Sequence, residues 1–256
     1  MNSHEEGGTH KTLLGHIEDL RWTLIKSGGV LLASMVLCFC FRGWLADMLE
    51  RPLRTAAPDQ SLQSLGVADS FTVSMELAFY AGIVLAFPLI LYFVAQFILP
   101  ALTRAESRVL LPVVVVGFFL FLAGVMFAYF AILPLALGFF YADATQVMGW
   151  KTMWTVREYY TFASTLTLSF GVAFQLPLVV VALVKLGILN YAMLARTRRY
   201  AVMIIAIVSV LLTPPDVFTL FLMGVPLYLL YEACIAIAWF LNRKSSKNQT
   251  IGARTE

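Results

Sequence analysis

Long apolar stretches recur along the whole chain, and they limit its possible folds more than any other feature. A helix needs about 20 consecutive, mainly apolar residues to cross the hydrocarbon core of a bilayer. Hydrophobic residues make up 60% of the 256 residues and charged residues 13%, whereas soluble domains carry about 45–50% and about 25%. The sequence therefore predicts an all-α, polytopic integral membrane protein.

Six stretches have the composition of membrane spans. They cover residues 22–41, 77–99, 109–140, 162–184, 201–212 and 218–241. The first is too long for a signal-peptide core and lacks a small-residue cleavage site behind it, so it is predicted to be a true span. The fifth is short, because about 15 residues of helix rise only about 22 Å, and we expect it to lie in thin bilayer or behind its neighbours.

Five prolines fall in these spans or at their ends: Pro88, Pro112, Pro134, Pro177 and Pro226. A proline in a helix frees a backbone carbonyl and bends the axis. The simpler interpretation is that membrane helices tolerate these prolines and that they have no special role. Five in one small chain favour bent helices in a concave, cup-shaped arrangement.

Basic residues predict the orientation, because Lys and Arg gather in cytoplasmic flanks. The side of the membrane that carries the N-terminal segment and the starts of the odd-numbered spans holds twelve of them: Lys11, Arg21, Arg104, Arg108, Lys185, Arg196, Arg198, Arg199, Arg243, Lys244, Lys247 and Arg254. The opposite side holds five: Arg42, Arg51, Arg54, Lys151 and Arg157. Both termini are therefore predicted to be cytoplasmic, with an N-terminal segment at 1–21, the membrane domain at 22–241 and a solvated tail at 242–256.

Several functional classes find no support in the sequence. The net charge of +3 is too small for a nucleic-acid binder. The chain has no phosphate-binding loop, metalloprotease motif or nucleophile elbow. The three cysteines lie in apolar stretches, and the three histidines have no zinc-site spacing. We expect no enzyme activity, no metal and no cofactor.

Carboxylates gather at the predicted cytoplasmic surface. Glu18 and Asp19 precede the first span, and Glu106 lies between the second and third. A carboxylate there suits a cationic ligand, and a guanidinium can meet it with two hydrogen bonds. Thr103-x-x-Glu106 is also a helix capping box, a form shared by Thr155-x-x-Glu158 and Thr213-x-x-Asp216.

Two polar residues lie inside predicted spans. Glu232 is either a functional carboxylate or an interfacial one near Arg243, and the sequence leaves both open. Gln175 can bond a neighbouring helix without titrating. If both are functional, they predict a midplane site of an ion-coupled or small-molecule carrier, which is the alternative function. A purely structural scaffold is a third possibility.

A set of motifs resembles the TatC family, the multi-spanning core subunit of the twin-arginine protein translocase. The resemblance runs from about His16 to Asn242. Its motifs, in order, are: Phe87-Pro-Leu-Ile-Leu-Tyr92, Phe97-Ile-Leu-Pro-Ala-Leu102 with Glu106 and Arg108, Phe127-Ala-Tyr-Phe130 with Pro134, Phe170-Gly-Val-Ala-Phe174 with Pro177, and Leu211-Leu-Thr-Pro-Pro-Asp-Val-Phe218.

The resemblance implies a function and a set of site residues. It implies that the cytoplasmic face binds twin-arginine signal peptides of folded cargo, which are then exported through a prokaryotic cytoplasmic membrane by the proton-motive force. It also implies TatA- and TatB-type single-span partners and a homo-oligomer within the receptor complex. The implied signal-peptide-binding residues are Glu106, Asp19, Glu18, Arg21, Phe97 and Arg108. The implied partner-helix contacts are Thr213, Pro214, Pro215 and Asp216.

The chain departs from the family pattern at Asp19, at Gln175 and at Leu220, where a more polar side chain is expected. The family usually has Glu where this chain has Asp19, so Glu18 beside it could share the role. The family often has a buried Glu where this chain has Gln175, and an amide cannot take up a proton as a carboxylate does.

Overall fold

The chain folds almost entirely into helices. The computed structural model describes residues 13–58, 60–98, 110–185, 189, 191–212 and 217–252. The α-helices are: α1 (Leu13–Cys40), α2 (Arg42–Ala56), α3 (Asp69–Ile98), α4 (Leu110–Phe127), α5 (Leu133–Ala142), α6 (Val156–Ala173), α7 (Leu176–Lys185), α8 (Tyr191–Arg196), α9 (Arg198–Leu212) and α10 (Val217–Gly252). Two π-helical turns, η3 (Ala128–Ile132) and η4 (Asp143–Val147), flank α5, and two short strands, β1 (Leu62–Gln63) and β2 (Trp154–Thr155), pair in parallel.

Five segments in the described part of the chain are long and apolar enough to cross a membrane. They are: Ile17–Cys40, Asp69–Phe97, Pro112–Val147, Val156–Val184 and Val217–Phe240. The predicted all-α, polytopic membrane fold is therefore confirmed. The helix at the predicted fifth span, α9, has only 15 residues, so the sixth crossing stays a prediction, as does the concave arrangement.

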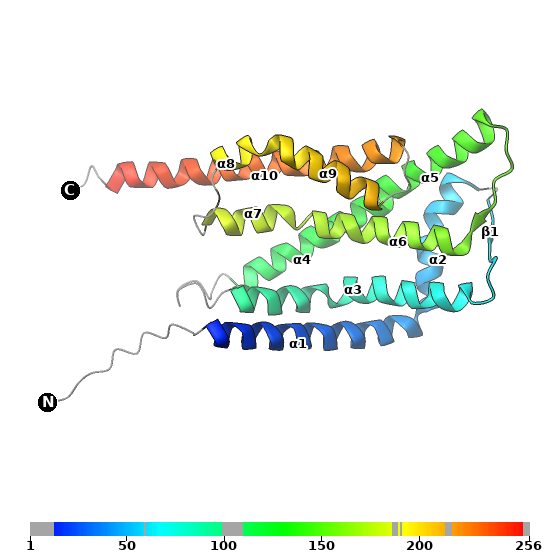
Figure 1. Cartoon of the computed structure of the whole chain (residues 1–256), viewed down its shortest axis with the longest axis horizontal. Helices are drawn as coiled ribbons and strands as arrows, with labels where there is room; N and C mark the ends of the chain where they lie inside the picture. The colour runs from blue at the N-terminus through cyan, green and yellow to red at the C-terminus, as the bar shows by residue number, and fades with distance from the viewer. Residues whose placement is uncertain are drawn as a thin grey trace.

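The long helices run roughly parallel or antiparallel to one another (Figure 1). Helix α1 packs along α3, and α4 crosses from α3 toward α6 on a diagonal. Helix α1 begins and α10 ends at the same end of the molecule, while α2 and β1 lie at the other end. The described termini of the bundle therefore share one side, as the charge count predicts.

Both terminal helices extend beyond the predicted spans. Helix α1 begins at Leu13, inside the segment predicted to precede the membrane domain. Helix α10 continues to Gly252 through most of the predicted solvated tail. A helical backbone satisfies its own hydrogen bonds, so it can continue from lipid into the aqueous phase without a break.

The prolines act differently at different positions. Helices α3 and α10 continue through Pro88 and Pro226. Pro134 instead opens α5 directly after the π-helical turn, and Pro177 opens α7 after the two-residue break that follows Ala173. The predicted interruptions therefore occur at Pro134 and Pro177, where the freed carbonyls coincide with a change in helical geometry.

Between the first and second predicted spans the chain forms a helix, α2, that the sequence patterns did not indicate. Helix α2 is held by three tyrosine hydroxyls, which donate to its main-chain carbonyls: Tyr129 to Met48 (2.5 Å), Tyr159 to Leu49 (2.6 Å) and Tyr160 to Ala46 (3.3 Å). Its Leu53 is fully buried in the main core. Nearby, Gln60 and Thr152 exchange two hydrogen bonds of 3.1 and 2.7 Å beside the β1–β2 pair.

Helices α4 and α6 approach closely because a glycine lies between them. A Cβ atom on Gly124 would lie 2.5 Å from the carbonyl oxygen of Phe170, which no side chain could tolerate without a backbone shift. Small residues allow such close contacts between membrane helices. The fully buried Phe121 and Phe170 fill the same region, so this contact fixes the centre of the bundle.

Candidate functional site

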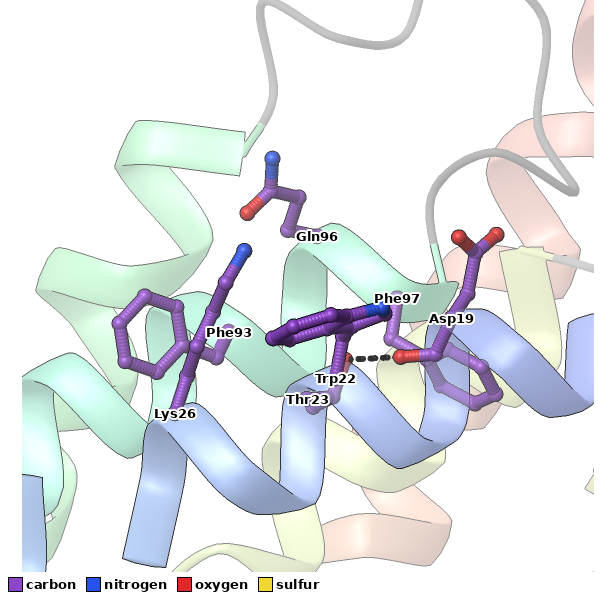
Figure 2. A pocket seen from close by; sticks show the side chains of 7 residues that line it. All are labelled: Asp19, Trp22, Thr23, Lys26, Phe93, Gln96 and Phe97. Atoms are coloured by element: carbon purple, nitrogen blue, oxygen red, sulfur yellow. Dashed lines mark hydrogen bonds between the residues drawn. The ribbon is translucent and has the colours of Figure 1, made fainter. Parts of the chain in front are cut away.

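A pocket lies between α1 and α3, near the end of the bundle where α1 begins (Figure 2). It has a volume of about 160 Å³. Its lining residues are: Asp19, Trp22, Thr23, Lys26, Phe93, Gln96 and Phe97. The α1 residues follow the spacing i, i+3, i+4, i+7 and the α3 residues the spacing i, i+3, i+4, which places each set on one helix face.

The pocket has opposite charges at its two ends. Asp19 and Lys26 lie on the same face of α1, and the Trp22 ring lies between them (Figure 2). The Thr23 hydroxyl donates to the main-chain carbonyl of Asp19 at 2.8 Å. The Lys26 side chain extends toward Gln96 on α3. The pocket therefore combines an acid, a cation, an amide and aromatic rings in one place.

The structure brings together only some of the predicted signal-peptide residues. Asp19 and Phe97 line the pocket from α1 and α3. Glu18 and Arg21 are exposed on α1 and do not line it. Glu106 and Arg108 lie outside the described residues, in the segment that follows α3.

Sequence reasoning missed five of the seven lining residues: Trp22, Thr23, Lys26, Phe93 and Gln96. The signal that could have found the α1 residues is the spacing of Asp19, Trp22, Thr23 and Lys26, which repeats at helical intervals. No comparable pattern pairs them with Gln96, because that pairing depends on how α3 packs.

Gln175 lies at the break between α6 and α7 and contacts α4. Its Nε2 donates to the main-chain carbonyl of Gly117 at 2.9 Å, so the predicted bond to a neighbouring helix is confirmed. Its Oε1 is buried, with no hydrogen-bond partner in the part of the chain that the structure describes. A Cβ on Gly117 would lie 2.5 Å from Leu91 and 3.3 Å from that oxygen. This position therefore places a glycine of α4 directly against the side-chain amide of Gln175.

Glu232 forms an ion pair rather than an open site. Its Oε2 accepts from Arg198, the first residue of α9, at 3.0 Å, and its Oε1 accepts from the Tyr228 hydroxyl at 2.8 Å. Arg198 belongs to the basic cluster predicted to face the cytoplasm. The contact therefore favours the interpretation that Glu232 lies at the membrane interface. Glu232 and Gln175 also have different partners, on different helices.

The predicted partner-helix residues, Thr213, Pro214, Pro215 and Asp216, lie outside the described residues. The helices on either side of them carry two fully or almost fully buried polar residues, Ser209 on α9 and Thr219 on α10. Gly224 on α10 faces Ser209, because a Cβ there would lie 3.9 Å from its Oγ. Polar groups therefore accumulate where α9 meets α10.

Metal-binding residues do not cluster in the described part of the chain, where no group of three or more His, Cys, Asp or Glu side chains could hold an ion. Cys38, Cys40 and Cys234 are free thiols.

The fold and these sites define a polytopic α-helical membrane protein whose polar groups lie at helix contacts and at one end of the bundle. The model of the Sec-independent protein translocase protein (TatC) family matches residues 15–226. The chain belongs to this family and is a component of the Sec-independent protein translocase.

Individual relatives agree with this assignment. TatCd of Bacillus subtilis (strain 168) is 35% identical over 243 residues, covering 94% of this chain and 97% of that protein. TatC of Akkermansia muciniphila is 47% identical over 179 residues, covering 70% of this chain, and the match spans only 51% of the relative's length. A crystal structure of the twin-arginine translocase receptor TatC matches with a TM-score of 0.82 at 33% identity, covering 88% of this chain and 98% of that one.

Proposed function

We propose that this chain is the signal-peptide receptor of a twin-arginine translocase. It binds the twin-arginine signal peptides of folded proteins at its cytoplasmic face. Together with TatA- and TatB-type single-span subunits, and as a homo-oligomer in the receptor complex, it exports this cargo across a prokaryotic cytoplasmic membrane by the proton-motive force. Both termini lie in the cytoplasm.

The observation that carries this proposal is that Asp19 and Phe97 line one pocket, near the start of α1 and the end of α3. A carboxylate beside aromatic rings offers a guanidinium both an ion pair and a stacking surface. Glu106 follows α3 by a few residues in sequence and is the second acid for a pair of arginines. The proposed surface also includes Glu18 and Arg21, which are exposed on α1, and Arg108, which follows Glu106 by two residues in sequence.

Charge alone gives little affinity, because exposed ion pairs contribute about 0–1 kcal/mol each. The apolar segment of a signal peptide would add burial against the helices. The exposed apolar side chains of α1, such as Leu24 and Ile25, offer such a surface beside the pocket.

The single-span partners are proposed to contact the region where α9 meets α10, around Thr213–Asp216. The exposed apolar side chains of Val210, Val217 and Phe221 on either side of this region support the choice, because a partner helix could cover them. The short α9 would leave part of this region to be covered by a partner helix.

The test is export of a twin-arginine reporter in cells that lack their own core subunit, with and without this gene. The chain should restore export, and Glu106→Gln, or more strongly Glu106→Lys, should abolish crosslinking of the precursor while the protein stays inserted. Unchanged crosslinking in both variants would remove Glu106 from the site. Saturable solute uptake by the purified chain alone in liposomes would instead support a carrier.

A further inference from the structure

We propose that α2 is a membrane-surface helix, which lies in the phospholipid headgroup region at the end of the bundle away from the described termini. Phe41, Trp44 and Met48 insert among the lipid chains, and Arg51 contacts the lipid phosphates. We call these four residues the α2 stripe. The partner is the phospholipid surface itself, so the proposal rests on the membrane-spanning fold and not on signal-peptide binding.

The α2 stripe is one continuous exposed surface. Its residues follow the spacing i, i+3, i+7, i+10, which places them on one helix face. Phe41, Trp44 and Met48 are 58%, 63% and 38% exposed, and Arg51 is also exposed. A helix with aromatic and apolar side chains on one face and basic residues beside them is the kind that lies in a membrane interface, where tryptophan is enriched.

The opposite face of α2 is held in place, so the stripe cannot turn inward. Leu53 is fully buried in the main core, and three tyrosine hydroxyls bind the main chain of α2. At the start of the helix, the Arg42 guanidinium lies 4.8 Å from the centre of the Phe39 ring on α1. Phe39 in turn packs edge-on against Phe71 of α3. The orientation of the stripe is therefore set by contacts on the other side of the helix.

The same contacts place α2 at the level of the membrane-spanning segments rather than beyond them. Tyr129 belongs to the apolar segment Pro112–Val147 and Tyr159 to the segment Val156–Val184, and both donate to α2. A single residue separates α2 from α1, which is itself an apolar segment. Helix α2 lies across the direction of the long helices (Figure 1). It therefore runs along the membrane surface where the apolar segments end.

Exposed apolar side chains lead from α1 to the stripe. Leu32, Val36 and Leu37 on α1 are 65%, 68% and 52% exposed. They belong to a segment long and apolar enough to cross the bilayer. Phe41 follows Leu37 by four residues, and Trp44 by seven. The apolar surface of a membrane-spanning helix therefore continues onto α2, which favours the bilayer as the partner that covers both.

The cation of the stripe matches an anionic surface. Arg54, on the polar flank of α2, pairs with Glu50 at 3.4 Å and with Asp47 at 3.6 Å. Arg51 takes part in none of the ion pairs among the described residues. A long basic side chain beside an apolar surface can extend to the headgroups while its stem stays in the apolar layer. Lipid phosphates at this level therefore complement Arg51.

The experiment measures the depth of Trp44 in vesicles that contain the full chain. Since the chain has five tryptophans, the Trp44 signal is the difference in fluorescence between wild-type protein and Trp44→Phe. This signal should fall more with lipids brominated near the headgroup end of the acyl chain than with lipids brominated near the methyl end, and iodide in the water should quench it little. Quenching mainly by iodide, or mainly by bromine near the methyl end, would overturn the proposal.

The matched control moves the reporter to the polar flank of the same helix. Trp44→Phe combined with Asp47→Trp places a tryptophan where the native side chain is 73% exposed. This reporter should be quenched by iodide and little by the brominated lipids. If the two positions respond alike, α2 has no lipid-facing side and the proposal fails.

A second measurement needs no tryptophan and checks the same faces. Met48→Cys and Asp47→Cys are compared in a chain with Cys40→Ala, because Cys40 is the exposed native thiol while Cys38 and Cys234 are buried. In vesicles opened so that a water-soluble maleimide reaches both surfaces, the thiol of Met48→Cys should react at least about ten-fold more slowly, because the thiolate is the reactive form and apolar surroundings disfavour it. Labelling after denaturation gives the total thiol. Equal rates in the folded protein would contradict insertion of the stripe.

Discussion

The Tyr129 hydroxyl donates a 2.5 Å hydrogen bond to the main-chain carbonyl of Met48, 81 positions away in sequence. Met48 lies four residues before Pro52, inside the same helix. A proline has no N–H, so the carbonyl four residues earlier loses its helical donor. Tyr129 therefore replaces the missing hydrogen bond and joins α2 to the central bundle.

Tyr129→Phe should lower the free energy of unfolding by about 1–3 kcal/mol, because it leaves a partly buried acceptor without a donor. Unfolding in mixed detergent would measure this loss. The matched control is Tyr92→Phe, since Tyr92 is exposed and its hydroxyl has no hydrogen bond among the described residues. Equal losses in the two variants would show that the bond to Met48 contributes nothing.

Gln175 should tolerate an apolar side chain better than an acidic one. Gln175→Leu loses the hydrogen bond to Gly117 but also removes a buried oxygen that has no partner in the described chain, so stability should stay within about 1 kcal/mol. Gln175→Glu at neutral pH either carries a buried charge 2.9 Å from a carbonyl oxygen or must take up a proton at a cost in free energy, and it should destabilise more. The check is the order of thermal unfolding midpoints, and a glutamate variant as stable as wild type would contradict the contact.

The Arg198–Glu232 pair should couple α9 to α10. The side chains are 47% and 30% exposed, so the coupling free energy should be no more than about 1 kcal/mol. A double-mutant cycle with Arg198→Met and Glu232→Gln would measure it, and the charge swap Arg198→Glu with Glu232→Arg should recover part of the loss. Strict additivity of the two single variants would mean that the pair does not stabilise the fold.

Thr155 caps α6, as the Thr-x-x-Glu pattern predicts. Its hydroxyl accepts from the Glu158 amide at 3.2 Å and lies 3.0 Å from the Glu158 carboxylate. Thr155→Val keeps the shape but removes the hydroxyl, and it should cost about 1 kcal/mol of unfolding free energy. Thr155→Ser should retain nearly all of the stability. If valine and serine behave alike, the cap is not the source of the stabilisation.

Short sequence patterns predicted the features that depend only on neighbouring residues, namely the long apolar helices and a helix cap. The apolar runs located the five long spans, because transfer of a helix into lipid is governed by its composition. The Thr155 cap followed from a four-residue pattern. Helix α2 was missed because it is amphipathic rather than apolar, and an apolar-run search treats residues 42–56 as a loop.

Long-range partners could not be predicted from one sequence. The sequence showed that Gln175 would bond a neighbouring helix, but the choice of Gly117 depends on how closely α4 approaches. Asp19 was identified through family resemblance, whereas its pocket neighbours Lys26 and Gln96 emerge only when α1 packs on α3. These contacts depend on how the helices pack against one another, and the spacing of residues along one sequence does not predict that packing.

The most direct test of the receptor proposal is the affinity of the purified chain for two signal peptides that differ only in an arginine pair replaced by a lysine pair. A guanidinium matches a carboxylate with two parallel hydrogen bonds, and an ammonium does not. The arginine peptide should bind at least about ten-fold more tightly, a difference of about 1.4 kcal/mol, and Asp19→Asn with Glu106→Gln should remove the difference. Equal affinities for the two peptides in the wild-type protein would contradict recognition of arginine at this pocket.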